Sequence, residues 1–143
     1  VYRYRLYNQE NKIVPLKEEL AFLDSYTYLL RTRFNENLLI ENRISDRSDI
    51  IMVAPASLQM LIENAIKHNV ASKKLPLKII LEKRDDYIVV SNTLQKKEIE
   101  EESTRIGLRN IIDRYKLLSD QPVIIERTPS QFIVKIPVLQ IEA

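Results

Sequence analysis

Residues 55–69 read Pro-Ala-Ser-Leu-Gln-Met-Leu-Ile-Glu-Asn-Ala-Ile-Lys-His-Asn, and the rest of the chain is organised around this stretch. Its apolar residues recur at intervals of three and four, which is typical of an amphipathic helix with one face against a core. Proline suits the first helical position, where its missing N–H has no intrahelical partner, so we predict that the helix begins at Pro55. The residues of the predicted buried face are Leu58, Leu61, Ile62, Ala65 and Ile66.

The opposite face of this predicted helix carries four side chains that can bind ligands: Glu63, Asn64, Lys67 and His68. Their spacing places a carboxylate, an amide, an ammonium and an imidazole on one side of the helix. An amide oxygen can bind a hard cation, and lysine and histidine can donate to phosphate oxygens. The same pattern is also that of a solvated polar face with a Glu63–Lys67 ion pair, and the helix alone leaves both interpretations open.

The composition of the 143-residue chain narrows the classes of protein to consider. Its length fits one domain, or one domain with an appendage. The net charge is +2 and the charges are interleaved, so no basic stripe indicates binding to nucleic acid. Cysteine is absent, which excludes disulfides, cysteine-based metal sites and a cysteine nucleophile. No apolar run approaches the length of about eighteen residues that a membrane span needs, and no signal peptide is visible.

Apolar periodicity predicts the remaining elements. A helix is predicted over 16–34, with acids at its start and arginines at its end as the helix dipole prefers, and the tail of another helix over 1–8. A third helix is predicted over 106–118. The predicted strands are 38–44, 77–82, 87–90, 123–126 and 131–136, with a short apolar run at 50–53. Strands interrupted by helices indicate an α+β fold, a two-layer sandwich of one mixed, mostly antiparallel sheet covered by helices on one face.

Two features around the third predicted helix point to a ligand. The highly charged segment 91–104 has little to bury and predicts a mobile loop over a surface, although an exposed linker has the same pattern. Gly107, the only glycine, falls in the predicted first turn, where it would let an anion approach the free N–H groups. Close packing is the other interpretation of this glycine. Arg105 and Arg109 flank it and can add charge-assisted contacts, and Ser103 or Thr104 can cap the helix.

Three stretches carry a family resemblance. Residues 58–68, Leu-Gln-Met-Leu-Ile-Glu-Asn-Ala-Ile-Lys-His, are similar to the N-box of LytS-type sensor histidine kinases, which reads Leu-Gln-Pro-Leu-Val-Glu-Asn-Ala-Ile-Lys-His. Residues 14–34 begin with Val-Pro-Leu-Lys-Glu-Glu-Leu and resemble the segment that links the phosphoacceptor helices to the ATPase domain. Residues 106–115, Ile-Gly-Leu-Arg-Asn-Ile-Ile-Asp-Arg-Tyr, resemble the second glycine box and its helix.

The resemblance implies the Bergerat ATP-binding sandwich, with residues 1–34 as the end of the linker and dimerisation helices and residues 35–143 as the ATPase domain. It also implies ATP and Mg²⁺ as cofactors. Asn64 would bind Mg²⁺ through its side-chain oxygen, with phosphates and waters completing the shell. Lys67 and His68 would face the phosphates.

Further site residues follow from the same resemblance. Gly107 and Leu108 would offer backbone N–H groups to the phosphates, beside Arg105, which stands where the family has a glycine. Glu63 matches the family as a catalytic residue that would orient water or a ligand. Residues 93–104 would form the ATP lid, a loop that orders on nucleotide.

The first glycine box departs from the family pattern. The family reads Asp-Asn-Gly-x-Gly after a strand, and its Asp accepts a hydrogen bond from the adenine amino group. Strand alternation puts Asn92 at the Asp position, with Leu94 and Lys96 where glycines belong, whereas a shift of one residue would put Ser91 there. An amide oxygen accepts without charge assistance, so we expect adenine binding to be weaker.

The sequence therefore predicts the ATP-binding catalytic domain of a bacterial two-component sensor histidine kinase. The only histidine, His68, lies in the predicted phosphate site, so we expect the phosphorylated histidine upstream of Val1. The resemblance implies dimerising helices and membrane spans there, hence a cytoplasmic domain of an inner-membrane sensor that forms a homodimer and has a LytR-like response regulator as partner. The alternative is a degenerate interaction module of the same fold that binds no nucleotide. A related ATPase or serine kinase is a third possibility, against which the linker helix argues.

Overall fold

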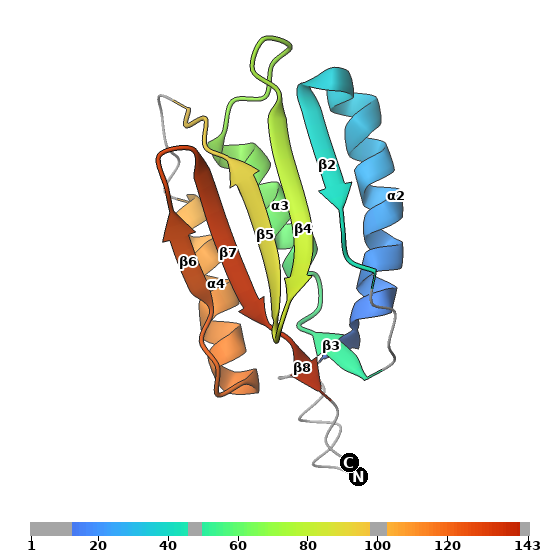
Figure 1. Ribbon diagram of the computed structural model, residues 1–143, viewed down its shortest axis with the longest axis vertical. Helices are drawn as coiled ribbons and strands as arrows, with labels where there is room; N and C mark the ends of the chain where they lie inside the picture. Colours follow the sequence, from blue (N-terminus) through green and yellow to red (C-terminus); the bar gives the residue numbers. More distant parts are fainter. Residues whose placement is uncertain (1–12, 46–49, 98–102, 141–143) are drawn as a thin grey trace.

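A five-stranded sheet and three helices form two layers, with the helices on one face of the sheet (Figure 1). The computed structural model describes residues 13–45, 50–97 and 103–140. The predicted two-layer α+β fold is confirmed. The predicted helix tail at 1–8 lies outside the described residues. The helices are α2 (Leu16–Phe34), α3 (Ser57–His68) and α4 (Ser103–Leu118).

The main sheet has the strand order β2-β4-β5-β7-β6. Its β2 and β4 are parallel because the chain crosses over through α3 between them, and all other neighbours are antiparallel. Buried residues alternate along β2 and the first part of β4, as a sheet covered on one side requires, whereas residues 88–92 of the central β5 are all buried. The strands are β2 (Leu38–Asn42), β4 (Leu77–Arg84), β5 (Tyr87–Thr93), β6 (Ile124–Arg127) and β7 (Gln131–Pro137).

The connection between β4 and β5 is shorter than residues 83–86, which the predicted strands 77–82 and 87–90 leave between them. The turn consists of Asp85 and Asp86 alone, and Asp85 has a φ of 52°, which aspartate tolerates and two-residue hairpins require. At its far end β5 continues through Thr93, so residues 91–93 belong to the strand and not to the predicted loop. Strand pairing with β7 as far as Thr93 explains this extension, because Gln131 pairs with that residue.

The prediction of a single sheet is wrong in one respect. A second sheet joins β1 (Val14–Pro15), β3 (Ile51–Val53) and β8 (Leu139–Gln140) in the order β1-β3-β8, with both pairs antiparallel. Strands of two residues are too short to show an alternation, so no sequence pattern marks β1 or β8. The pairing places the segment that enters α2 beside the segment that leads into α3.

The predicted position of Pro55 is also wrong, since α3 begins at Ser57. The Ser57 N–H donates to the Ala54 carbonyl at 3.2 Å, and Ala56 has a left-handed conformation with φ 61° and ψ 12°. Pro55 and Ala56 are therefore the central residues of a β-turn, and proline is favoured at the first of these positions by its fixed φ. The proline ends the preceding segment instead of opening the helix.

The core lies between the two layers and centres on α3. Of its predicted inward face, Leu58, Leu61, Ile62 and Ala65 are buried, and Ile66 is half-buried. Four leucines of α2 belong to the same core: Leu16, Leu20, Leu23 and Leu30. The division into a linker segment 1–34 and an ATPase domain 35–143 stays a prediction.

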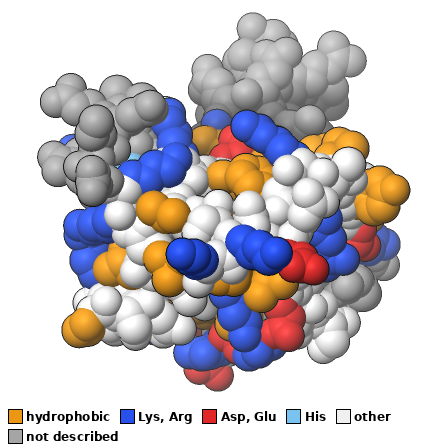
Figure 2. Space-filling model, turned by 90° about the horizontal axis from the view of Figure 1, so that it is seen from above, with side chains coloured by type: hydrophobic (Ala, Val, Ile, Leu, Met, Phe, Trp, Pro, Cys, Tyr) orange, Lys and Arg blue, Asp and Glu red, His pale blue; other side chains and the backbone are white. Residues whose placement is uncertain are grey.

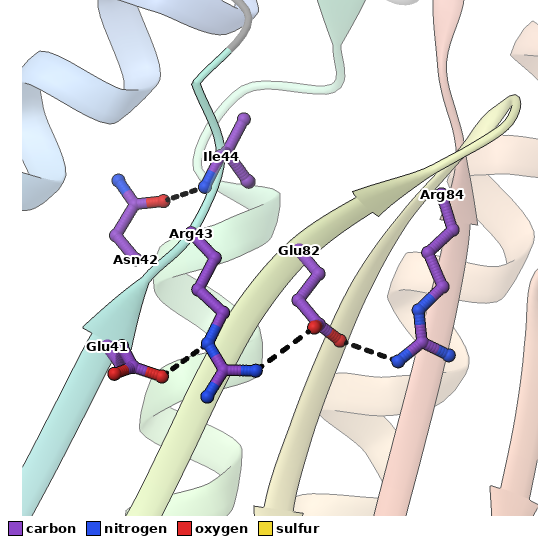
Figure 3. A network of polar contacts seen from close by, with 6 residues as sticks. All are labelled: Glu41, Asn42, Arg43, Ile44, Glu82 and Arg84. Atoms are coloured by element: carbon purple, nitrogen blue, oxygen red, sulfur yellow. Dashed lines mark hydrogen bonds and ion pairs between the residues drawn. The ribbon is translucent and has the colours of Figure 1, made fainter.

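The opposite face of the sheet carries charges at one end (Figure 3), whereas Val89 and Ser91 of the central β5 are buried on it. Arg43 donates to Glu41 and, at 3.3 Å, to Glu82, which also accepts from Arg84 at 2.8 Å. The neighbouring Asn42 accepts from the Ile44 N–H at 2.9 Å, which turns the chain away from the sheet. These residues alternate with buried ones along β2 and β4, so the charges keep this face solvated without disturbing the core.

Candidate functional site

A pocket of about 190 Å³ lies between the end of α3, the beginning of α4 and the ends of β5 and β7. Four of the residues singled out from the sequence line it: Asn64, His68, Asn92 and Leu108. Two of them come from α3, one from β5 and one from α4, so the fold brings together positions that lie far apart in the sequence. Lys96, Arg127 and Phe132 also line it.

The polar residues of α3 divide between two directions. Asn64 and His68 are four residues apart, share one side of the helix and line the pocket, and both are half-buried. Glu63 and Lys67 are exposed and are not among the residues that line the pocket. Glu63 instead accepts hydrogen bonds from the Tyr26 hydroxyl of α2 at 3.2 Å and from the Gln59 amide at 3.0 Å. The face that the sequence presented as one site is therefore split.

Asn92 occupies the place in β5 that strand alternation predicts. It is 5% exposed and lines the pocket, and its Nδ2 donates to the Thr93 carbonyl at 2.7 Å. With Nδ2 directed to the backbone, Oδ1 is the side-chain atom suited to accept from a ligand. Ser91 does not line the pocket, because the pleat directs it to the other face of the sheet. Of the two residues considered for this position, Asn92 lines the pocket and Ser91 does not.

The beginning of the predicted lid is fixed to the end of α3. Asn69 is buried, and its side chain donates to the Ala65 carbonyl at 2.8 Å and accepts from the Gln95 N–H at 2.7 Å. The Gln95 side chain in turn donates to the Val70 carbonyl at 2.8 Å. Residues 94–97 are therefore held in place, and the interpretation of 91–104 as mobile throughout is wrong for this part. Residues 98–102, the centre of the predicted lid, lie outside the described residues.

Gly107 does not lie in the first turn of its helix. The helix α4 begins at Ser103, three residues before the predicted start, so Gly107 is its fifth residue and Ser103 and Thr104 lie inside the helix. At this position the N–H groups of Gly107 and Leu108 are expected to donate to the carbonyls four residues earlier in the same helix. A Cβ added at Gly107 would meet no atom within 4 Å, which argues against close packing as the reason for the glycine. The side chain of Arg105 lies outside the described part of the structure, and Arg109 is exposed.

Sequence reasoning missed three residues of the pocket wall, namely Asn69, Arg127 and Phe132. Arg127, at the end of β6, lies with its guanidinium carbon 5.4 Å from the centre of the Phe132 ring on β7, a cation–π contact. Phe132 is the residue that pairs with Asn92 across the two strands. Neither Arg127 nor Phe132 belongs to a local motif, and only the pairing of β5, β6 and β7 brings them to the pocket.

The end of the molecule that holds the pocket is rich in positive charge. Seen from above, it shows more lysine and arginine than acidic side chains (Figure 2). The exposed lysines and arginines that line the pocket or directly adjoin a lining residue in the sequence include Lys67, Lys96, Lys97 and Arg127. Among the residues that the structure describes, no three acidic or histidine side chains gather into a metal site. The arrangement suits an anionic ligand better than a metal held by protein alone.

Comparisons with known proteins find similarity to histidine kinases over parts of the chain. The sequence profile of the family "Histidine kinase" matches residues 1–38. The chain is 34% identical over 73 residues to the sensor protein LytS of Bacillus subtilis, a match that covers 51% of this chain and 12% of that protein. It is 28% identical over 136 residues to the Bacillus subtilis protein YwpD, covering 86% of this chain and 49% of that protein. The chain thus spans only a small part of LytS.

Solved structures share the fold. The cytoplasmic segment of histidine kinase QseC superimposes with a TM-score of 0.60 at 15% identity, covering 92% of this chain and 78% of that one. The catalytic domain of histidine kinase ThkA gives a TM-score of 0.55 at 17% identity, covering 87% and 94%. These likenesses confirm the expected Bergerat-type sandwich. In the described residues, no helix has the length and apolar character needed to cross a bilayer.

Proposed function

We propose that this chain, which resembles LytS-type sensor histidine kinases in sequence and histidine kinase catalytic domains in fold, binds Mg·ATP as the catalytic domain of such a kinase. The observation that carries the proposal is the pocket itself, which places Asn64 and His68 of α3 opposite Asn92 of β5. The family model, the relatives and the fold support the kinase class, and the pocket chemistry supports the ligand.

The wall formed by β5, β7 and α4 suits the adenine base. Leu94, Leu108 and Phe132 supply apolar and aromatic surface, and Asn92 supplies a buried acceptor at one point of it. The adenine amino group would donate to the Asn92 Oδ1. Because this amide is neutral where the family has a carboxylate, the hydrogen bond lacks charge assistance and we expect a lower affinity than in the family at large.

The α3 side of the pocket suits the phosphates. Asn64 offers one side-chain oxygen to Mg²⁺, and few protein ligands are needed, because this ion commonly keeps waters and phosphate oxygens in its shell. When bound, Mg²⁺ neutralises phosphate charge, which is its usual contribution to phosphoryl transfer. His68 lines the same wall, and Lys96 and Arg127 add positive charge at the pocket. The donor set thus fits Mg·ATP without a carboxylate cluster.

Other parts of the assignment follow from the resemblance. The N–H groups of Gly107 and Leu108 would reach a phosphate only if the first turn of α4 unwinds. Because His68 belongs to the pocket wall, the phosphorylated histidine would be supplied by a segment upstream of Val1. The whole protein would then be a dimeric, membrane-bound sensor, with this chain on the cytoplasmic side and a LytR-like response regulator as partner.

A second candidate function is an interaction module of the same fold that binds no nucleotide. Specific observations favour it: Leu94 and Lys96 stand at the pocket where the family has glycines, and the Gly107 N–H falls to a helical carbonyl. Bulky residues at these positions keep a loop from wrapping closely around phosphates.

Calorimetric titration with Mg²⁺ and the non-hydrolysable ATP analogue AMP-PNP tests the two functions. We expect the wild-type chain to bind, Asn64→Ala to lose the Mg²⁺-dependent affinity, and Asn92→Asp to bind more tightly. Asn110→Ala is the matched control, because Asn110 is exposed on α4 away from the pocket wall. Absence of binding by the wild-type chain at millimolar analogue would refute the kinase assignment in favour of the interaction module. Equal affinity of wild type and Asn64→Ala would refute the role of Asn64.

A further inference from the structure

The first turn of α3 receives its capping acceptor from another helix. The residue at the N-cap position is Ala56, and it makes no side-chain cap. Glu19 of α2, only 5% exposed, accepts a hydrogen bond from the Leu58 N–H at 3.0 Å. A carboxylate at a helix N-terminus satisfies an orphan donor and complements the helix dipole. Glu19 therefore caps the N-terminus of α3, which the alanine at position 56 cannot do.

The same carboxylate is buried at some cost. Burial raises the pKa of Glu19, while the backbone N–H groups of Leu58, Ala56 and Gln59 oppose the rise. A buried carboxyl group is tolerated where its oxygens are hydrogen-bonded, and here the partners belong to α3. The energetic balance at this residue therefore depends on how α2 and α3 lie against each other.

A second polar contact joins these helices closer to the pocket. The Tyr26 hydroxyl of α2 donates to Glu63 of α3 at 3.2 Å, and Glu63 directly precedes Asn64. Burial and the neighbouring Glu63 raise the pKa of Tyr26 to about 12, so this hydroxyl keeps its proton. On α2 the two contact residues, Glu19 and Tyr26, are two helical turns apart, so they fix the direction of α3 as well as its end.

The strands that precede the two helices are paired as well. Val14 and Pro15 of β1 pair with Val53 and Met52 of β3. The β3 strand leads through the short turn at Pro55 directly into α3. The segment from β1 through α2 thus contacts the beginning of α3 in two ways. The backbone of β1 pairs with β3, which leads into α3, and the Glu19 side chain of α2 accepts from the first turn of α3.

We propose that Glu19 is a positioning residue of the nucleotide site, which holds α3 in the orientation that directs Asn64 and His68 into the pocket. A displacement of α2 by the segment upstream would reach the pocket by moving α3. The effect on nucleotide affinity rests on the proposed function, but the effect on the position of α3 does not.

The test uses the whole chain and nuclear magnetic resonance of His68, the only histidine. Ten residues separate Leu58 from His68, which is about 15 Å along the helix. A buried charge is screened by salt less than an exposed one, so distance alone does not exclude a direct effect of the lost charge on the His68 ring. Glu19→Gln removes the same charge and keeps an acceptor, so a larger shift in Glu19→Ala than in Glu19→Gln reports movement of α3.

The variants are Glu19→Ala, Glu19→Gln and the matched control Glu18→Ala, since Glu18 is exposed on the same turn of α2. We expect Glu19→Ala to shift the Leu58 amide, the Asn64 side-chain amide and the His68 ring, and to weaken AMP-PNP binding on the order of tenfold, as misplaced groups do. Glu19→Gln keeps an acceptor, so its shifts should be smaller and in the same direction. Glu18→Ala should leave all resonances and the affinity unchanged.

Local shifts alone would overturn the proposal. If Glu19→Ala moves the Leu58 amide but leaves Asn64 and His68 as in the wild-type chain, Glu19 caps the helix without positioning the site. If Glu19→Ala does not fold, Glu19→Gln decides by the same criterion. If the wild-type chain binds no AMP-PNP, the proposed function fails, and the resonances of Asn64 and His68 still decide the inference about α3.

Discussion

The substitution Tyr115→Phe tests how firmly α4 is joined to the beginning of α3. Tyr115 is fully buried, and its hydroxyl accepts from the Ala54 N–H at 3.0 Å and lies 3.0 Å from the Ser57 Oγ. The single Ser57 hydroxyl proton goes to the Ala54 carbonyl at 2.8 Å, so the tyrosine donates to the serine oxygen. The substitution removes one acceptor and one donor at a place that water does not reach.

The expected cost follows from the groups that remain. Without the hydroxyl, the buried Ala54 N–H has no acceptor in this position, and an unsatisfied buried donor costs about 1–3 kcal/mol. Ser57 keeps its bond to the Ala54 carbonyl and adds little. We therefore expect Tyr115→Phe to lower the free energy of unfolding by about 2 kcal/mol, with little change in fold because the ring still fills its space.

Urea denaturation followed by circular dichroism measures this loss. The matched control is Tyr87→Phe, because the Tyr87 hydroxyl donates to the Pro122 carbonyl at 3.0 Å in an exposed setting where water can replace it. We expect the control to cost less than about 0.5 kcal/mol, as exposed substitutions do, with equal denaturant slopes for all three proteins. Equal stabilities of Tyr115→Phe and Tyr87→Phe would refute the reasoning that the buried hydroxyl joins the helices.

Three further predictions concern stability and the pocket. Gly107→Ala should raise the free energy of unfolding by roughly 1 kcal/mol, because alanine favours the helix and the added Cβ meets no atom within 4 Å. The same variant should bind AMP-PNP more weakly. A lower stability than that of the wild-type chain in urea would contradict the stability prediction. Burial raises the pKa of Tyr115 and Tyr26 to about 12, so these hydroxyls lose their protons at lower pH in the unfolded chain than in the folded one. The free energy of unfolding should therefore fall as the pH rises from about 10 to about 12. Thermal melts of Tyr115→Phe over this range should show a shallower fall than those of the wild-type chain. Ile62→Ala should cost about 2–5 kcal/mol in urea because Ile62 is fully buried, whereas Ile125→Ala, 39% exposed, should cost far less.

Much of the fold could be predicted because its elements carry strong periodic patterns. The helix over 16–34 has the predicted bounds, and the buried face of α3 is the one that the spacing of Leu58, Leu61 and Ile62 indicates. The small sheet could not be predicted, since β1 and β8 have two residues each and gain their partners only in the folded chain. The observed start of α3 at Ser57 differs from the predicted Pro55 because proline suits a turn as well as a first helical turn.

The residue types of the candidate site could be predicted more readily than the directions in which their side chains point. Asn64, His68 and Asn92 were singled out from the sequence, and the structure brings all three to one pocket. The sequence groups Glu63 with Asn64 and His68, because it lies one to two helical turns before Lys67 and His68. The side chain points instead to Tyr26, a partner 37 residues away in the sequence that no local pattern can supply.

The order of the side chains along the chain is sufficient to predict the three helices, the five strands of the main sheet, the buried face of α3 and the polar residues that this helix can offer to a ligand. These properties depend on the order of neighbouring side chains, which periodicity expresses. Two features arise only in the folded chain: Phe132 and Arg127 complete the pocket, and Glu19 caps α3 from another helix. Those contacts join residues dozens of positions apart, and their geometry exists only once burial of the common core has brought the layers together.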